Sequence, residues 1–161
     1  MFYSQGMLQK RRRPSHPDVV QSWDRPPIIF VTTCTRGRKP ILARPEVLTL
    51  LRSVWTDSND WLVGRFVIMP HHIHLFCSPA RLDSGPVGNW VRYWKSLATR
   101  RWPRPEERPI WQSDYWDRQL RSDESYRQKW EYVRLNSVRH GLAKNPAEWP
   151  YQGELNVLQW H

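Results

Sequence analysis

Two histidines separated by one residue, His72 and His74, are the side chains of this sequence best suited to chemistry. They lie in an apolar run, Met69-Pro70-His71-His72-Ile73-His74-Leu75-Phe76-Cys77. Alternate residues of a β-strand point to the same side, so the imidazoles should lie together with the apolar residues behind them. Neutral imidazoles are frequent metal ligands, and the pair therefore predicts part of a metal site. Two histidines with purely structural hydrogen bonds remain the alternative at this point.

A second group, Tyr132 and Asn136, lies on a segment expected to be helical from Ser122 or Asp123 to about His140. Residues four apart are one helical turn apart and share a side of the helix. The amide and the two imidazoles would suit a divalent cation, and the phenol beside it would suit attack on a phosphodiester. A covalent phosphotyrosine conserves the energy of the broken bond, which suits strand transfer better than hydrolysis.

The hydrophobic pattern predicts the elements that must position these groups. Strands are expected at residues 28–35, 61–69, 71–78 and within 110–120, and helices at 45–55, 87–102 and 122–140. The fold class is therefore α+β, a ferredoxin-like βαββαβ antiparallel sheet with an additional C-terminal helix that carries the tyrosine. The first two helices cover one face of such a sheet, and the histidines are expected on the other, open face.

Bulk properties favour one domain and a polyanionic partner. The 161 residues carry a net charge of +10, and no apolar run is long enough to cross a membrane. We expect a basic, partly irregular arm at residues 1–27, one domain at 28–151 and a tail at 152–161. Candidate contacts to nucleic acid are Lys10, Arg11, Arg12 and Arg13 in the arm and Arg92, Lys95, Arg100 and Arg101 on the second helix.

The cysteines and aromatic residues indicate the cellular compartment and the composition of the core. Cys34 and Cys77 have no spacing typical of a metal or disulfide motif, and both are expected to pack as small apolar residues in a reducing cytoplasm. The N-terminus lacks the apolar core of a signal peptide. Most of the eleven tryptophans should be core, and exposed ones would suit stacking on unpaired bases.

Taken in order, several motifs resemble the single-tyrosine HUH transposases, specifically the REP-associated tyrosine transposase branch. They span about residues 28 to 151 and comprise Met69–His74, Trp111-Gln112, Tyr115–Arg118, Leu120-Arg121, Tyr132–Leu142 and Pro146–Tyr151. The resemblance implies that His72 and His74 bind Mg²⁺ or Mn²⁺, with Asn136 as third ligand. It also implies that Tyr132 attacks single-stranded DNA at palindromic hairpin repeats and becomes linked to the 5′ phosphate. We expect a nucleoid-associated cytoplasmic enzyme that works as a monomer.

This chain departs from the family pattern at two positions. His71 stands where Asn or Glu is usual, and strand geometry predicts that it points away from His72. Ser137 stands where proline is usual, which should alter the path of the helix end more than the chemistry. Neither departure removes a group that the proposed chemistry needs.

Other tyrosines and the last helical histidine have simpler interpretations. Tyr93 and Tyr126 are expected to pack in the core, and Tyr115 belongs to an aromatic cluster. His140 is expected to stabilise the dipole at a helix end, and a contact with DNA is the alternative.

Two other functions stay open from the residues alone. A non-catalytic single-stranded or hairpin nucleic-acid-binding protein would use the sheet without the histidines. A nucleotide hydrolase with a histidine nucleophile would carry a further alternating histidine, and Phe76 occupies that position.

Overall fold

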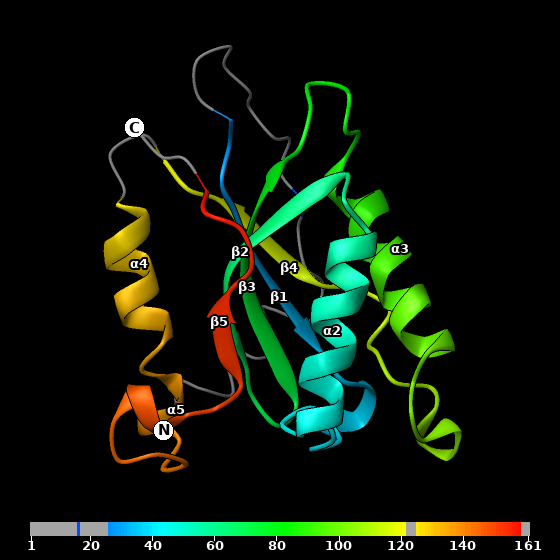
Figure 1. The fold of residues 1–161 in the computed structure, drawn as a ribbon, viewed down its shortest axis with the longest axis vertical. Coiled ribbons are helices and arrows are strands. Elements are labelled where there is room, and N and C mark those ends of the chain that lie inside the picture. Colours follow the sequence, from blue (N-terminus) through cyan, green and yellow to red (C-terminus); the bar gives the residue numbers. More distant parts are fainter. Residues whose placement is uncertain (1–15, 17–25, 122–124, 159–161) are drawn as a thin grey trace.

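A five-stranded antiparallel sheet in the order β4-β1-β3-β2-β5 forms the middle of the molecule (Figure 1). The computed structural model describes residue 16, residues 26–121 and residues 125–158. The strands are β1 (Ile29–Cys34), β2 (Trp61–Ile68), β3 (His72–Pro79), β4 (Trp116–Gln119) and β5 (Gln152–Glu154). The helices are α2 (Pro45–Asp57), α3 (Val87–Arg100), α4 (Tyr126–Val133) and α5 (Asn136–Arg139), with short 3₁₀ turns at Arg36–Arg38, Pro105–Glu107 and Pro146–Glu148. The predicted ferredoxin-like order of strands and helices is confirmed. Within the described residues, no helix combines the length and the apolar character that crossing a membrane requires.

Helices α2 and α3 cover one face of the sheet and enclose the larger core (Figure 1). Pro45 begins α2, a position where its missing N–H costs nothing. Trp94 of α3 lies at the centre of this core, with its ring centroid 5.7 Å from that of Trp55 and 5.4 Å from that of Trp111. Edge-on contacts of this kind add to the burial of large apolar area, and the predicted core role of most tryptophans is confirmed for this cluster.

Helix α4 covers part of the opposite face, which the sequence predicted to be open. Its buried residues Tyr126 and Val133 join a second apolar cluster with Phe76 of β3, and the rings of Phe76 and Tyr126 are 4.9 Å apart. The prediction was wrong because this helix also has an apolar stripe, which needs a partner surface.

The segment that carries the tyrosine is two helices rather than one. Ser125 caps α4 by accepting a hydrogen bond from the Gln128 N–H at 3.2 Å, so the helix begins later than predicted. It ends at Val133, and α5 begins at Asn136.

The predicted C-terminal tail contains an edge strand. Residues of β5 pair with Arg65, Phe66 and Val67 of β2, next to a register shift between Val63 and Phe66. At this bulge the Arg65 N–H donates to the Tyr126 hydroxyl at 2.9 Å. A side chain on Gly64 would come within 2.6 Å of both that hydroxyl and Leu158, so only glycine lets α4 approach this closely.

Lys95, predicted as a DNA contact, is a structural residue instead. Its side chain is buried at 7 % relative exposure, and its Nζ donates to the backbone oxygens of Gln112 and Asp114 at 2.7 and 3.4 Å. Burial lowers the pKa of Lys95 to about 8. The ammonium therefore joins the segment before β4 to α3. Its buried position also leaves it no access to a polyanion.

We expect Lys95→Met to lower the free energy of unfolding by about 1–3 kcal/mol, since two carbonyl acceptors lose a charged donor. Urea unfolding would measure this loss. The control Arg92→Met, at an exposed position of the same helix, should stay within about 0.5 kcal/mol of wild type. Unchanged unfolding together with weakened DNA binding by Lys95→Met would restore the original assignment.

Candidate active site

Strand β3 places His72 and His74 side by side, as the sequence predicted. Their ring centroids are 4.8 Å apart, and both side chains are half-buried on the face that α4 partly covers. Ile73 and Leu75 point the other way and are fully buried in the core under α2 and α3. The alternation of the strand therefore separates two polar rings from the apolar core behind them.

The Nδ1 atom of each imidazole has a partner. His74 Nδ1 lies 2.8 Å from Oγ1 of Thr32, its cross-strand neighbour on β1. His72 Nδ1 lies 3.1 Å from His71 Nδ1. The prediction that His71 points away was wrong, because β3 begins only at His72 and the strand alternation does not extend to the turn before it. A proton on Nδ1 of His74, donated to Thr32, would leave Nε2 free to bind a ligand, and the same holds for His72 when its Nδ1 donates to His71.

Both imidazoles are neutral at neutral pH. Burial, reinforced by the neighbouring imidazoles, lowers the pKa of His72 to about 3. Burial and the positive charge of Arg139 lower the pKa of His74 to about 4. A neutral imidazole is the form that binds a metal ion, and these two pay no cost of deprotonation.

Arg139 connects the two residues predicted on the last helical segment. Its Nη2 donates to the backbone oxygen of Tyr132 at 2.8 Å and to Asn136 Oδ1 at 2.9 Å. Its guanidinium carbon lies 4.3 Å from the centroid of the Tyr132 ring, which is 62 % exposed. Tyr132 and Asn136 therefore stay together although the helix is interrupted between them.

Side-chain contacts join this segment to the histidine side of the sheet within one chain. Lys129 Nζ lies 5.9 Å from the Tyr132 ring centroid and 5.5 Å from that of Phe30. The Phe30 ring in turn stacks on His74, with centroids 5.3 Å apart. The His140 ring, directly after α5, lies 6.2 Å from that of His72. Tyr132 and the paired histidines thus share one face of the sheet.

The donor atoms suit a divalent cation without a carboxylate. No three His, Cys, Asp or Glu side chains gather as a metal site in the part of the chain that the structure describes. The imidazole nitrogens of His72 and His74, with the Asn136 amide oxygen expected from the sequence, form the candidate set, a mixture that suits first-row divalent ions. The Asn136 oxygen already accepts a hydrogen bond from Arg139. Cys34 stands opposite His72 in the register but is only half-buried, unlike Cys77. Burial raises the pKa of the Cys34 thiol, which keeps it neutral.

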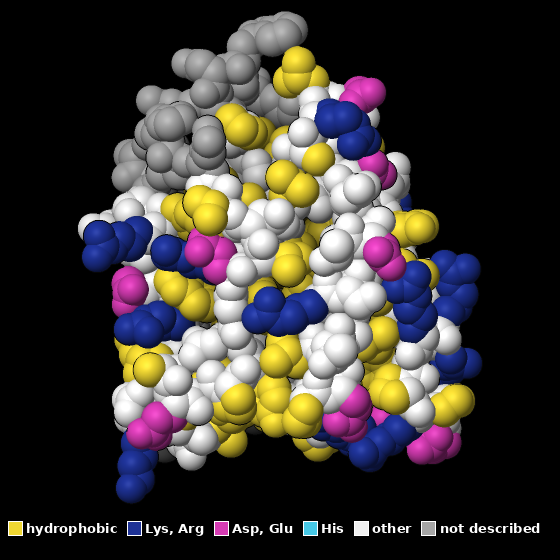
Figure 2. Space-filling model, viewed as in Figure 1, with side chains coloured by type: hydrophobic (Ala, Val, Ile, Leu, Met, Phe, Trp, Pro, Cys, Tyr) yellow, Lys and Arg dark blue, Asp and Glu magenta, His cyan; other side chains and the backbone are white. Residues whose placement is uncertain are grey.

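The described basic residues that were predicted to contact DNA lie away from the histidines, whereas Lys10, Arg11, Arg12 and Arg13 are outside the described residues. Arg92 and Arg100 lie on α3, which packs on the sheet face opposite the histidines. Arg101 directly follows α3 and pairs with Asp57 at 2.8 Å. Figure 2 shows Lys and Arg spread over one side of the molecule with acidic side chains among them, not gathered in one patch.

The other tyrosines are mostly packed. Tyr115 and Tyr126 are 5 % and 7 % exposed, as expected for core residues. Tyr93 is 53 % exposed, so the prediction that it packs in the core was wrong. The Ser137 hydroxyl is buried and has no hydrogen-bond partner within the described residues.

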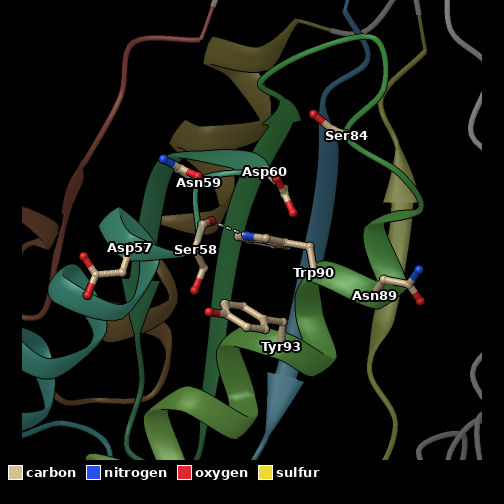
Figure 3. A pocket seen from close by; sticks show the side chains of 8 residues that line it. All are labelled: Asp57, Ser58, Asn59, Asp60, Ser84, Asn89, Trp90 and Tyr93. Carbon is tan, nitrogen blue, oxygen red and sulfur yellow. Dashed lines mark hydrogen bonds between the residues drawn. The ribbon is translucent and has the colours of Figure 1, made fainter.

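A polar pocket of about 380 Å³ lies at the far end of β3 from His72, between the end of α2 and the start of α3 (Figure 3). Trp90 Nε1 donates to the Ser58 backbone oxygen at 2.6 Å on its wall. Its two carboxylates, Asp57 and Asp60, are already paired with arginines. The pocket is separate from the candidate active site because it lies at the opposite end of β3 from His72.

Sequence reasoning missed Thr32, Lys129 and Arg139. Helical spacing contained a signal for the last two, since Lys129 precedes Tyr132 by three residues and Arg139 follows Asn136 by three. The contact of Thr32 with His74 depends on the register of β1 against β3, which no local pattern specifies.

Known proteins with similar sequence and structure belong to one class. The REP-associated tyrosine transposase of Escherichia coli is 23 % identical over 124 residues, covering 76 % of this chain and 73 % of that protein. A Haemophilus influenzae protein that carries the same name provisionally is 29 % identical over 96 residues, 52 % of this chain and about half of its own length, 53 %. No protein-family model matches the chain.

A solved structure, described as a REP-associated tyrosine transposase bound to a REP hairpin, shares the fold. Its TM-score is 0.67 at 21 % identity, covering 85 % of this chain and 82 % of that chain. The chain therefore shares the α+β fold of that structure. It is a relative of the REP-associated tyrosine transposases, and the resemblance indicated by the motifs is confirmed.

Proposed function

We propose that this protein is a metal-dependent single-strand DNA endonuclease and strand transferase that acts at palindromic hairpin repeats. One observation supports this most directly. An exposed tyrosine, an amide and two neutral imidazoles share one face of the sheet within a single chain. The relatives named as transposases, and the related structure bound to a REP hairpin, support the choice of substrate. A site assembled from one chain also supports a monomer, which we expect to act in the cytoplasm at the nucleoid.

In this proposal Tyr132 is the nucleophile. Its phenolic oxygen bonds to the scissile phosphorus and gives up its proton, while the bond from phosphorus to the 3′ oxygen breaks. That oxygen takes up a proton and leaves as a 3′ hydroxyl, and the phosphate remains on Tyr132 with the 5′ end. Attack by a 3′ hydroxyl on this phosphotyrosine reverses the step and rejoins the strand.

His72, His74 and Asn136 would hold Mg²⁺ or Mn²⁺, which, when bound, polarises a non-bridging phosphate oxygen and offsets developing charge. The contacts of Thr32 and His71 with the Nδ1 atoms fix how the two imidazoles are turned. Arg139 keeps Asn136 beside Tyr132. Each residue thus has a defined task in binding or orientation.

A labelled hairpin oligonucleotide with an unpaired flank tests the proposal. Incubation with Mn²⁺ or Mg²⁺ should give a covalent protein–DNA adduct, and peptide mapping should find the nucleotide on Tyr132. Chelator should prevent the adduct. Tight hairpin binding with no adduct in either metal would instead identify a non-catalytic DNA-binding protein.

We expect Thr32→Val to weaken Mn²⁺ binding by about 10–100-fold, because the imidazole of His74 loses the partner of its Nδ1 atom. The valine keeps the shape of the side chain, so the thermal unfolding midpoint should change little. Mn²⁺ titration followed by paramagnetic broadening of histidine resonances would measure the affinity. Equal Mn²⁺ affinity in Thr32→Val and wild type would remove Thr32 from the site.

A further inference from the structure

We propose that Arg139 and Lys129 together bind the phosphate group that Tyr132 attacks, an inference that rests on the proposed function. We call these two residues the phosphate clamp. Lys129 comes three residues before Tyr132 on α4, and Arg139 ends α5. No residue of the clamp was among the DNA contacts expected from charge along the sequence.

Geometry places the clamp at the nucleophile. The guanidinium of Arg139 lies 4.3 Å from the Tyr132 ring centroid, and the ammonium of Lys129 lies 5.9 Å from it. Arg139 is fixed by two hydrogen bonds from one nitrogen, Nη2, to the Tyr132 backbone and to Asn136. Its Nη1 and Nε make no hydrogen bond within the described residues, so the guanidinium still has N–H donors to offer to a phosphate oxygen.

Charge balance supports an anion at this place. Within the described part of the chain neither Arg139 nor Lys129 pairs with a carboxylate, whereas nearby Arg134 bonds to Glu131 at 2.9 Å. Two cations and a metal ion in one place repel each other, and a phosphate between them removes that repulsion.

The clamp would also determine which phosphate is attacked, because it lies beside Tyr132, whereas the basic residues of α3 do not. A phosphate held between two cations that contact the tyrosine ring is held close to the phenol. Positioning of this kind raises the rate of attack by a nucleophile that is weak on its own. Arg139 would both touch the substrate and position Asn136, while Lys129 would touch the substrate alone.

Hairpin binding in chelator, with no cleavage, tests the clamp. The probes are the hairpin oligonucleotide and a copy in which one phosphate of the unpaired flank is an uncharged methylphosphonate, moved from linkage to linkage. For the wild-type protein, neutralising one particular linkage should lower the affinity for the hairpin about tenfold, as expected for the loss of one charged contact. Arg139→Gln and Lys129→Gln should each bind the normal hairpin more weakly, with a salt slope reduced by about 0.7.

The decisive comparison combines the two changes. If the clamp holds the phosphate, Arg139→Gln and Lys129→Gln should each bind the normal hairpin and the hairpin neutralised at that linkage with nearly the same affinity. If instead the affinity lost through the protein variant and the affinity lost through the neutralised linkage multiply as independent effects, the proposal is overturned. Arg134→Gln is the matched control, because its guanidinium is already paired, and it should behave as wild type. If Arg139→Gln fails to fold, Lys129→Gln alone carries the test.

This experiment separates the clamp from the chemistry. A wild-type protein that forms the Tyr132 adduct but shows no coupling would retain the proposed function and lose the clamp. A protein that shows the coupling but forms no adduct would retain the clamp as a binding site and lose the proposed function.

Discussion

Tyr132→Phe is expected to abolish the covalent adduct with the hairpin oligonucleotide, with a loss of at least about a thousandfold in its rate of formation. Only the attacking oxygen is removed. The ring that contacts Arg139 and Lys129 remains, and the exposed position of Tyr132 means that no core contact is lost. The free energy of unfolding and the affinity for the hairpin in chelator should therefore stay near those of wild type.

Tyr93→Phe is the matched control for this change. Tyr93 is similarly exposed, at 53 % against 62 %, but it lies on α3 beside the polar pocket and away from the histidines. Removal of the Tyr93 hydroxyl should leave adduct formation unchanged. Adduct formation that survives in Tyr132→Phe would place the nucleophile on another residue and remove the central assignment.

His74→Ala is expected to reduce metal-dependent adduct formation by more than about a hundredfold, because loss of a ligand should exceed the 10–100-fold effect of losing an outer partner. Mn²⁺ titration should show a parallel loss of affinity. Hairpin binding in chelator should persist, since Arg139 and Lys129 are untouched. His72→Ala should behave in the same way.

His140→Ala provides the comparison for the histidine variants. Its ring lies 6.2 Å from that of His72, but it follows α5 and is not part of the strand that carries the pair. We expect a much smaller change in Mn²⁺ affinity. If His140→Ala removed metal binding while His74→Ala retained it, the donor set assigned here would be wrong.

Local patterns predicted most of the fold and the location of the histidine pair. Alternation along β3 was enough to place His72 and His74 on one face with Ile73 and Leu75 on the other, because a strand permits only two directions. Proline and helical periodicity placed α2 closely. These features depend on the nearest few residues, which a sequence displays directly.

The rest depended on contacts between distant segments. The cover of α4 over the second face follows from its approach to Gly64 and Phe76. Charge alone was misleading for Lys95, since its ammonium replaces solvent contacts with two backbone carbonyls. A long cationic side chain on a helix has the same pattern in sequence whether it points outward or inward.

Within the described residues no carboxylate joins the paired imidazoles, and this has a consequence for when the proposed site would bind its metal ion. Neutral ligands beside two fixed positive charges attract a free divalent ion weakly, and an incoming nucleic acid brings the missing negative charge. By thermodynamic reciprocity, the bound strand raises the affinity of the protein for the ion, and the bound ion raises its affinity for the strand. Under the proposed function, such a site would bind its metal ion mainly when the target strand is also bound.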